Sequence, residues 1–319
     1  MANIKEIYRW VSAMKTGLIL LVMIGLISAL GSAIIPDIFF NTIIFKGLLI
    51  LLLVNLALCT FNQLIHFGTR SRGGLGRQSG LLLLHAGIVL ILVGGTVFAY
   101  YGQSGEISIA KGDTIAITKV IKLQQPFSLQ LNDFKIEFNQ NGSPSQYYSY
   151  VTVIEEGVTR AQETISVNHP LQYRKIKAYQ MSFGYLVSAK LTSAGGSEVQ
   201  KFLKEGDILE LTGTERVVKI YRYFPSFDPA GGMNQTSLKP DNPRVVYSVY
   251  EQGKLLGMGA AQFGEKVEID NTVDIVFSGV KPYTVLKLKS DPGLPIALTG
   301  GLMFMFGAVL SLLSTPVRQ

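Results

Sequence analysis

The sequence predicts a membrane protein with an α-helical bundle of four transmembrane spans and a large extracytoplasmic all-β, sandwich-like domain between spans 3 and 4. Three observations lead to this class. Apolar residues make up 48% of the 319 residues, and the mean hydropathy is +0.31, which is high for a soluble protein. Four almost uncharged runs are each about 20 residues long, enough to cross a bilayer as a helix. Between the last two runs, apolar and polar residues alternate as they do in β-strands.

The apolar runs extend over residues 16–35, 41–61, 80–101 and 294–313. The first run follows basic residues, as the core of a cleaved signal peptide does. It is longer than such a core, however, and a second run follows closely, so we expect it to be retained as a span. The expected organisation is an N-terminal membrane region with three helices, an extracytoplasmic β-rich domain, and a C-terminal helix with a short cytoplasmic tail, at residues 1–101, 102–293 and 294–319.

The distribution of charge predicts the orientation. The N-terminus, the loop after the second span and the C-terminus hold seven basic residues, Lys5, Arg9, Lys15, Arg70, Arg72, Arg77 and Arg318, against the acidic Glu6. The insert holds 21 basic and 20 acidic residues. Because cytoplasmic loops carry the excess of Lys and Arg, we expect both termini in the cytoplasm. The net charge of +7 follows mainly from this topology and gives no indication of nucleic-acid binding.

The third apolar run carries His85. A histidine in hydrocarbon needs a hydrogen-bond partner, a proton path or a metal. Gly80, Gly87 and Gly94 recur every seven residues and form a seam of small residues where another helix can approach closely. At about 100° per residue, His85 projects roughly 150° away from that seam. Either a neighbouring helix satisfies the imidazole, or the imidazole binds a ligand.

The single cysteine, Cys59, excludes an intramolecular disulfide, and we expect it to be a small apolar filler in the second span. The insert shows no phosphate-binding loop, catalytic triad or carboxylate dyad, and His169 is its only histidine. We therefore assign no catalytic residue.

The insert contains several short alternating runs, separated by turn signals at Asn141-Gly142, Glu156-Gly157, Gly195-Gly196, Gly253 and Gly264. These runs predict strands at residues 126–138, 147–157, 177–191, 215–224, 244–254 and 272–280. Since no stretch has a helical period, we expect an antiparallel β-sandwich or a pair of small β-domains. We expect a long loop over residues 225–243.

Ordered segments along nearly the whole chain resemble the ResB (CcsB) family of System II cytochrome c biogenesis. They are VSAMKTGLILL with GSAIIP, HAGIVLILVGG, FSLQLNDFKIEF with SPSQYYSYVTVIEEG, ISVNHPLQYRKIKAYQMSFGY, and SDPGLPIALTGGLMFMFG. The fourth segment is the most specific, with N-x-P-L and Y-Q-x-S patterns. It departs from the family at Arg174-Lys175, where a glycine is expected nearby.

This resemblance implies a subunit of the holocytochrome c synthase (haem lyase) complex, itself non-catalytic or co-catalytic. With a CcsA/ResC-like membrane protein, it handles haem b across the bacterial inner membrane. The complex then attaches the haem through thioethers to Cys-x-x-Cys-His sites of apocytochrome c. The thiols belong to the substrate, so we expect this chain to position the reactants.

The resemblance also implies candidate site residues. His85 matches the family's transmembrane histidine and is the candidate ligand of the haem iron. His66 and His169 are weaker haem candidates. The candidates for contact with the partner or substrate are Asn168, Pro170, Tyr173, Tyr179 and Gln180.

Two other classes stay open. A haem b electron-transfer subunit could use His66 and His85 as a pair of ligands. A structural envelope protein could bind a partner through its β-domain, with His85 merely packed.

Overall fold

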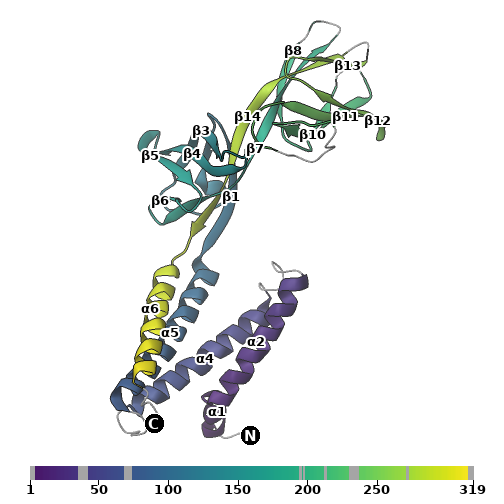
Figure 1. The fold of residues 1–319 in the computed structure, drawn as a ribbon. Helices are drawn as coiled ribbons and strands as arrows, with labels where there is room; N and C mark the ends of the chain where they lie inside the picture. Colours follow the sequence, from purple (N-terminus) through teal and green to yellow (C-terminus); the bar gives the residue numbers. More distant parts are fainter. Residues whose placement is uncertain are drawn as a thin grey trace. The chain divides into compact units, whose positions relative to one another are not determined.

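The computed structural model describes residues 4–34, 42–67, 74–193, 196, 198–211, 214–229, 237–270 and 273–314. The chain divides into two compact units, one helical and one of β-strands (Figure 1). The helical unit comprises Met1–Gly102 and Asp291–Gln319, and the β unit comprises Gln103–Ser290.

The helical unit contains the four apolar helices that the sequence predicts, each long enough to cross a membrane. It also contains a short helix, α1, that was not predicted. The described helices are α1 (Ile4–Val11), α2 (Met14–Ile34), α4 (Ile43–Ile65), α5 (Gly74–Tyr101) and α6 (Leu294–Leu313). Arg70, Arg72 and Arg318, which carry part of the orientation prediction, lie outside the described residues.

Helix α5 begins earlier than its apolar run. The apolar run starts at Gly80, whereas the helix starts at Gly74, so His85 lies about three turns inside the helix. Once the apolar run forms a helix, adding the preceding polar residues costs little, since propagation is far easier than nucleation.

The predicted glycine seam of α5 is confirmed, and α6 carries a matching one. Gly80, Gly87 and Gly94 contact α6 and its N-cap, where Gly293, Gly300 and Gly307 also recur every seven residues. A Cβ atom added at Gly87 would lie 2.6 Å from the carbonyl oxygen of Gly300, and one added at Gly300 would lie 2.6 Å from that of Gly87. The two backbones therefore approach more closely than any larger residue permits.

The described strands of the β unit form three sheets, and they all pair in antiparallel ladders. Its described strands are β1 (Gln103–Ala110), β2 (Thr114–Ala116), β3 (Ser128–Phe138), β4 (Pro144–Glu155), β5 (Val158–Ser166), β6 (Leu171–Tyr173), β7 (Ile176–Ser193), β8 (Glu198–Leu203), β9 (Ile208–Glu210), β10 (Arg216–Phe224), β11 (Arg244–Glu251), β12 (Lys254–Ala261), β13 (Lys266–Asp270) and β14 (Val273–Ser290). A short 3-10 helix, Ile117–Lys119, is the one helical element described in this unit.

Two hydrophobic cores divide the β unit into lobes. The first lobe packs around residues such as Leu129, Val153 and Leu288, and the second around residues such as Val218, Val245 and Phe277. The long paired strands β7 and β14 run through both (Figure 1). The ladder between them shifts register at Phe277/Gly279 and at Val285/Leu286. The part of β14 between these two shifts lies between the two cores. The antiparallel all-β prediction is thus confirmed, in the form of two cores on shared strands.

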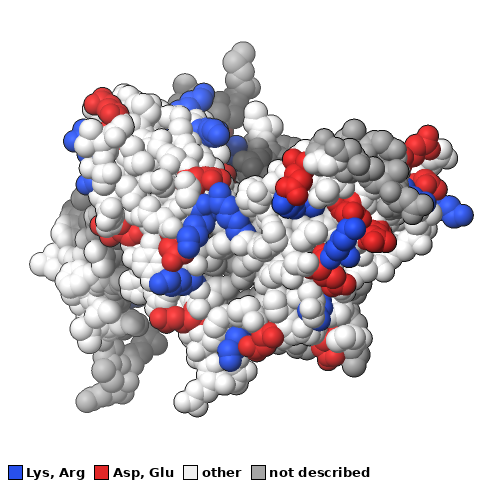
Figure 2. All heavy atoms as spheres, turned by 90° about the horizontal axis from the view of Figure 1, so that it is seen from above, with Lys and Arg blue, Asp and Glu red and all other residues white. Residues whose placement is uncertain are grey.

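The described turns match the predicted signals. Gly142, Gly157, Gly253 and Gly264 all have a positive φ, whereas Gly195 lies outside the described residues. The predicted long loop is tied at its base by a hydrogen bond from Phe227 N to Asn242 O, and its residues 230–236 are not described. Figure 2 shows Lys and Arg side chains interspersed with Asp and Glu over the visible face of the described residues, in agreement with the nearly equal counts in the insert.

Candidate functional site

His85 is half-buried on α5, and its hydrogen bonding fixes which ring nitrogen is open. Its Nδ1 lies 2.8 Å from the carbonyl oxygen of Leu81, one turn earlier in the same helix. Because a carbonyl oxygen only accepts, Nδ1 carries the proton and a neutral ring presents a lone pair at Nε2. Nε2 has no hydrogen-bond partner among the residues that the structure describes. Histidines that bind metals are oriented in this way, with the second nitrogen bonded to a carbonyl or carboxylate.

His66 follows the last turn of α4 and is exposed. Its Nδ1 lies 2.8 Å from the carbonyl oxygen of Asn62, again one turn earlier. Its ring therefore has the same local orientation as that of His85. Over the described part of the chain, no group of three or more His, Cys, Asp or Glu side chains could hold a metal ion.

Two polar side chains on α4 hold the turn between α1 and α2 in place. These contacts were not predicted from the sequence. Asn55 is 1% exposed, and its Nδ2 donates to the carbonyl oxygens of Val11, at 2.5 Å, and Ala13, at 3.1 Å. One turn later, Cys59 Sγ contacts the carbonyl oxygen of Ser12 at 3.1 Å. The detectable signal was an asparagine in an almost uncharged apolar run, since such a residue needs partners. Cys59 is thus more than the apolar filler that we expected.

His169 lies in a tight turn on the first lobe and is exposed. Ser166 and His169 exchange two backbone hydrogen bonds, and Asn168 between them has φ +65°. Asparagine tolerates this left-handed conformation better than most residues. The half-buried Pro170 follows directly and leads into β6. The left-handed backbone explains why an asparagine stands at position 168. The contacts of Asn168, His169 and Pro170 with haem or substrate stay predictions.

The structure explains how the chain tolerates Arg174 where the family pattern has a glycine nearby. Arg174 has φ +54° in the two-residue turn between β6 and β7, the conformation that favours the expected glycine. Its Nη2 donates to Glu155 Oε1 at 2.5 Å, and the hydroxyl of Tyr173 donates to Glu155 Oε2 at 3.1 Å. The nearby Arg160 also pairs with this nearly buried carboxylate. These contacts compensate for the strained backbone at Arg174. They also show that the Tyr173 hydroxyl bonds a residue of the same lobe, Glu155.

Gln180 belongs to a polar cluster in the interior of the first lobe. Its Oε1 accepts from the hydroxyls of Ser149, at 2.7 Å, and Thr284, at 3.1 Å, both of which are fully buried. Its Nε2 donates to the carbonyl oxygen of Ser182. The neighbouring Tyr179 is half-buried and faces Lys287 across the β7–β14 ladder. The structure thus places the six motif candidates, from Asn168 to Gln180 with His169 included, in the β unit, while His66 and His85 lie in the helical unit.

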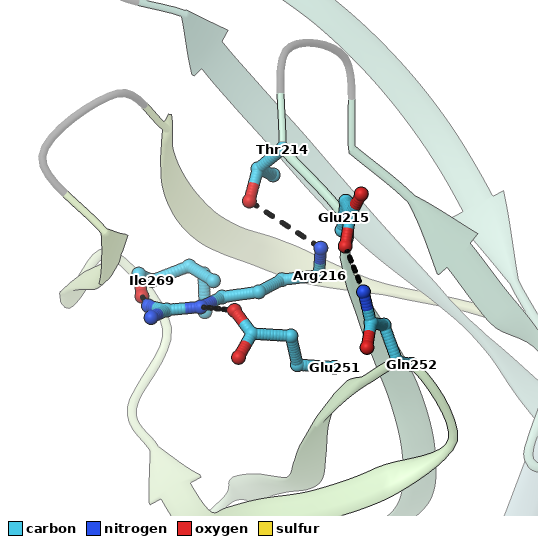
Figure 3. Close-up of polar contacts among 6 residues, drawn as sticks. All are labelled: Thr214, Glu215, Arg216, Glu251, Gln252 and Ile269. Carbon is cyan, nitrogen blue, oxygen red and sulfur yellow. Dashed lines mark hydrogen bonds and ion pairs between the residues drawn. The ribbon is translucent and has the colours of Figure 1, made fainter.

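A polar cluster ties three strands of the second lobe together (Figure 3). Arg216 Nε donates to Glu251 Oε1 at 3.0 Å across the β10–β11 ladder, and its Nη1 donates to the carbonyl oxygen of Ile269 in β13 at 2.6 Å. Gln252 Nε2 donates to Glu215 Oε2 at 2.6 Å beside them (Figure 3). The ion pair of Arg216 with Glu251 and the hydrogen bond that Glu215 accepts from Gln252 link neighbouring strands, so this cluster stabilises the lobe.

A pocket of about 340 Å³ lies between the two cores of the β unit and was not predicted. Its lining includes four aromatic residues and one ion pair; the lining residues are Phe183, Gly184, Tyr185, Val187, Glu205, Arg222, Tyr223, Leu238 and Tyr283. The rings of Tyr185 and Tyr223 meet edge to face with centroids 4.9 Å apart. Arg222 binds Glu205 through Nε and Nη2, at 3.0 and 2.9 Å.

The pocket environment raises the pKa of its tyrosines. Burial is the main cause for Tyr185, Tyr223 and Tyr283, and it raises the pKa of Tyr223 to about 12. These hydroxyls are therefore protonated at neutral pH and can donate hydrogen bonds. None of them has a hydrogen-bond partner among the described residues.

Comparison with known proteins identifies the family. The family model described as the ResB-like family matches residues 69–273. A cytochrome c biogenesis protein CcsB from Picosynechococcus sp. is 31% identical over 261 residues, which are 76% of this chain and 52% of that protein. A cytochrome c biogenesis protein Ccs1 from Porphyra purpurea is 27% identical over 250 residues, covering 76% of this chain and 54% of that protein.

The chain spans about half the length of these curated relatives. Among solved structures, Cytochrome c Heme Lyase CcmF aligns with 94% of this chain and 35% of its own, at a TM-score of 0.33 and 9% identity, a likeness too low to support an argument. The family match covers more than half of the chain, and the chain therefore belongs to the ResB-like family.

Proposed function

We propose that this chain is a membrane-embedded subunit of a cytochrome c biogenesis complex, in which it holds haem b as cargo and helps its attachment to apocytochrome c. The proposal rests on membership of the ResB-like family, with relatives named for cytochrome c biogenesis, and on the open Nε2 of His85. Haem supplies an iron atom that takes imidazole as an axial ligand.

The residues of this chain fit such a cargo. The hydrogen bond from His85 Nδ1 to the carbonyl oxygen of Leu81 holds the ring and leaves Nε2 for the iron. A CcsA/ResC-like partner would supply the second ligand, or His66 would. The exposed large apolar side chains of α2, α4 and α6 suit a lipid environment; examples are Leu18, Ile44 and Phe306. Four crossings with cytoplasmic termini would place the β unit outside the cytoplasm.

The chemistry divides between the chains. Thioether formation requires the thiols of the apocytochrome, and Cys59 of this chain is engaged at the corner between α1 and α2. We assign the chain a positioning role, without a catalytic acid, base or nucleophile, within the synthase (haem lyase) complex.

The test is coexpression with a CcsA/ResC-like partner and a reporter apocytochrome, in cells that lack their own maturation system. His85→Ala should abolish both the covalent haem of the reporter and the haem absorption of the purified complex. Added imidazole should restore part of the absorption, because a free ring can occupy the position of the lost side chain. His66→Ala and His169→Ala test the weaker candidates in the same assay.

The matched control is Thr96→Ala. Thr96 lies on the same helix, and its Oγ1 donates to the carbonyl oxygen of Leu92 at 2.8 Å, so the variant also loses a bond to the preceding turn. It should keep wild-type haem content. Equal haem loss in both variants, without rescue by imidazole, would contradict ligation by His85.

A further inference from the structure

The long strand β7 has an open edge in its middle. On the side away from β14, β6 pairs with Ile176 to Ala178, and β8 pairs with Val187 to Thr192. No described strand pairs with the intervening residues 179–186 on that side. Among the described residues, the one hydrogen bond to this backbone from outside the ladder is that from Gln180 Nε2 to the carbonyl oxygen of Ser182. Since Met181 is 52% exposed and Ser182 is exposed too, the edge can be reached.

The aromatic pocket borders this open edge. Its lining includes Phe183, Gly184 and Tyr185, three consecutive residues of the unpaired stretch. Side chains alternate between the two faces of a strand, so a pocket lined by consecutive residues borders the backbone itself. Gly184 has no side chain, and the ring of its cross-strand partner Tyr283 lies over it, in the space where a Cβ would stand.

We propose that an extended polypeptide binds here as an added strand on residues 179–186 of β7 and inserts a neutral aromatic side chain into the pocket. In strand addition, main-chain hydrogen bonds supply affinity and a pocket beside the edge supplies specificity. An unpaired edge is a ready template for such pairing.

The lining selects the kind of side chain. The ion pair of Arg222 with Glu205 neutralises the two charged groups, so the pocket has no unpaired charge for an anionic ligand. The rings of Tyr185 and Tyr223 offer edges and faces to a planar group, and their free hydroxyls offer hydrogen bonds. A volume of about 340 Å³ lies at the small end of ligand pockets and suits a side chain more than a large cofactor.

Position in the fold supports the same use. Phe183 packs against the first core and Tyr223 against the second, so both lobes contribute to the pocket. Pockets between lobes are common binding sites. The polypeptide that the proposed function would bring is apocytochrome c, and only this identity rests on the proposed function.

The test is hydrogen exchange on the full chain in nanodiscs, read by mass spectrometry. The probe is an acetylated, amidated heptapeptide of alternating threonine and valine with tyrosine at its centre, compared with the same peptide carrying serine there. The tyrosine peptide should slow exchange in residues 179–186 and should bind about tenfold more tightly or better. Protection elsewhere, no protection, or equal binding of the two peptides would overturn the proposal.

Variants separate the pocket from the rest of the fold. Tyr223→Ala should weaken binding of the tyrosine peptide about tenfold, whereas Tyr221→Ala should change it less than about twofold. Tyr221 lies on the same strand, is 41% exposed and does not line the pocket. Tyr223→Phe keeps the aromatic ring and loses only the hydroxyl. If this variant binds the peptide like wild type, the loss of binding in Tyr223→Ala comes from the missing ring. If added haem slows hydrogen exchange in residues 179–186 and the peptide does not, the proposal is overturned.

The same variants in the maturation assay distinguish this site from the proposed function. Peptide protection combined with failure of wild-type maturation would contradict the proposed function alone. Maturation by wild type and Tyr223→Ala alike, without peptide protection, would contradict the strand-addition site alone.

Discussion

The amide of Asn55 shows how one residue organises the first corner of the chain. It bonds two carbonyl oxygens in the turn between α1 and α2, and its Oδ1 occupies the space beside Gly17 where a Cβ would lie. This explains why a glycine stands at the start of α2. A buried amide of this kind stabilises only if its partners stay in place, because unpaired buried polar groups are costly.

Replacement of Asn55 by Ala should lower the unfolding free energy by about 1–3 kcal/mol, since two carbonyl oxygens lose their donor. Thermal unfolding in nanodiscs, followed by circular dichroism, measures the loss. Asn62→Ala is the control, because Asn62 Oδ1 accepts one exposed hydrogen bond, from Tyr8. Equal losses in the two variants would show that burial of the amide does not matter.

The hydroxyl of Tyr223 predicts a pH dependence. Burial raises its pKa from the ordinary 10 to about 12, so the native state keeps a proton that the unfolded chain releases. The stability that this proton contributes is fully present below about pH 10 and is lost as the pH rises towards 12. Chemical unfolding over this range should give a falling unfolding free energy, with a shallower fall in Tyr223→Phe. An identical slope in both proteins would contradict the assignment.

At the scale of elements, the paired glycines of α5 and α6 determine how closely two helices pack. Gly87 and Gly300 face each other across the contact, whereas Gly95 of α5 and Gly301 of α6 have nothing within 4 Å of a built Cβ. Each helix thus has one glycine that contacts the other helix and one that faces open space, which serves as its control.

Gly87→Ala should destabilise the helical unit by about 1–3 kcal/mol, because the added methyl group forces the backbones apart. Gly95→Ala should leave stability unchanged or raise it by up to about 1 kcal/mol, through its better helix propensity. Thermal unfolding of both variants in the same nanodiscs makes the comparison. A larger loss in Gly95→Ala would contradict the packing of this pair.

Local patterns were enough to predict the elements with strong periodicity. The apolar runs gave four helices, and alternation gave β3, β4, β7, β10 and β11, with part of β14. Strands such as β6, β9 and β13 are too short to show a period, and β12 is rich in glycine and alanine. The matching repeat of Gly293, Gly300 and Gly307 was not predicted, although it is also visible in the sequence.

The site was less accessible to sequence reasoning. The family resemblance singled out His85, but the tautomer follows from a bond to Leu81 that needs coordinates. The pocket joins Tyr185, Tyr223 and Tyr283 from three strands, whose register depends on bulges far apart in the chain. Local patterns contain no information about such long-range pairing.

At the scale of the whole molecule, the β unit is closed by its own ends. Gln103 and Ser290 are partners in the β1–β14 ladder, so the chain enters and leaves the unit at neighbouring positions. Since both cores lie within these limits, the unit has what a domain needs to fold alone.

A fragment comprising Gln103–Ser290 should therefore be soluble, monomeric and β-rich, as judged by size-exclusion chromatography and circular dichroism. A fragment ending at Asp270 lacks β14, which pairs with β1, β7 and β13, and it should fail to unfold cooperatively. Cooperative unfolding of the shorter fragment would show that β14 is dispensable.

The pairing of β1 with β14 also has a consequence for the order of events during synthesis. The second core draws on residues 187–277, one continuous stretch, whereas the first core needs Leu286 and Leu288 as well as residues from Ile107 onward. The lobe that is made first is thus completed last, after the later lobe has all of its residues. Until β14 arrives, β1 is an unpaired strand beside a growing chain, and such strands are prone to aggregate. The newly made β unit should therefore depend most on chaperones just before its final strand is translated.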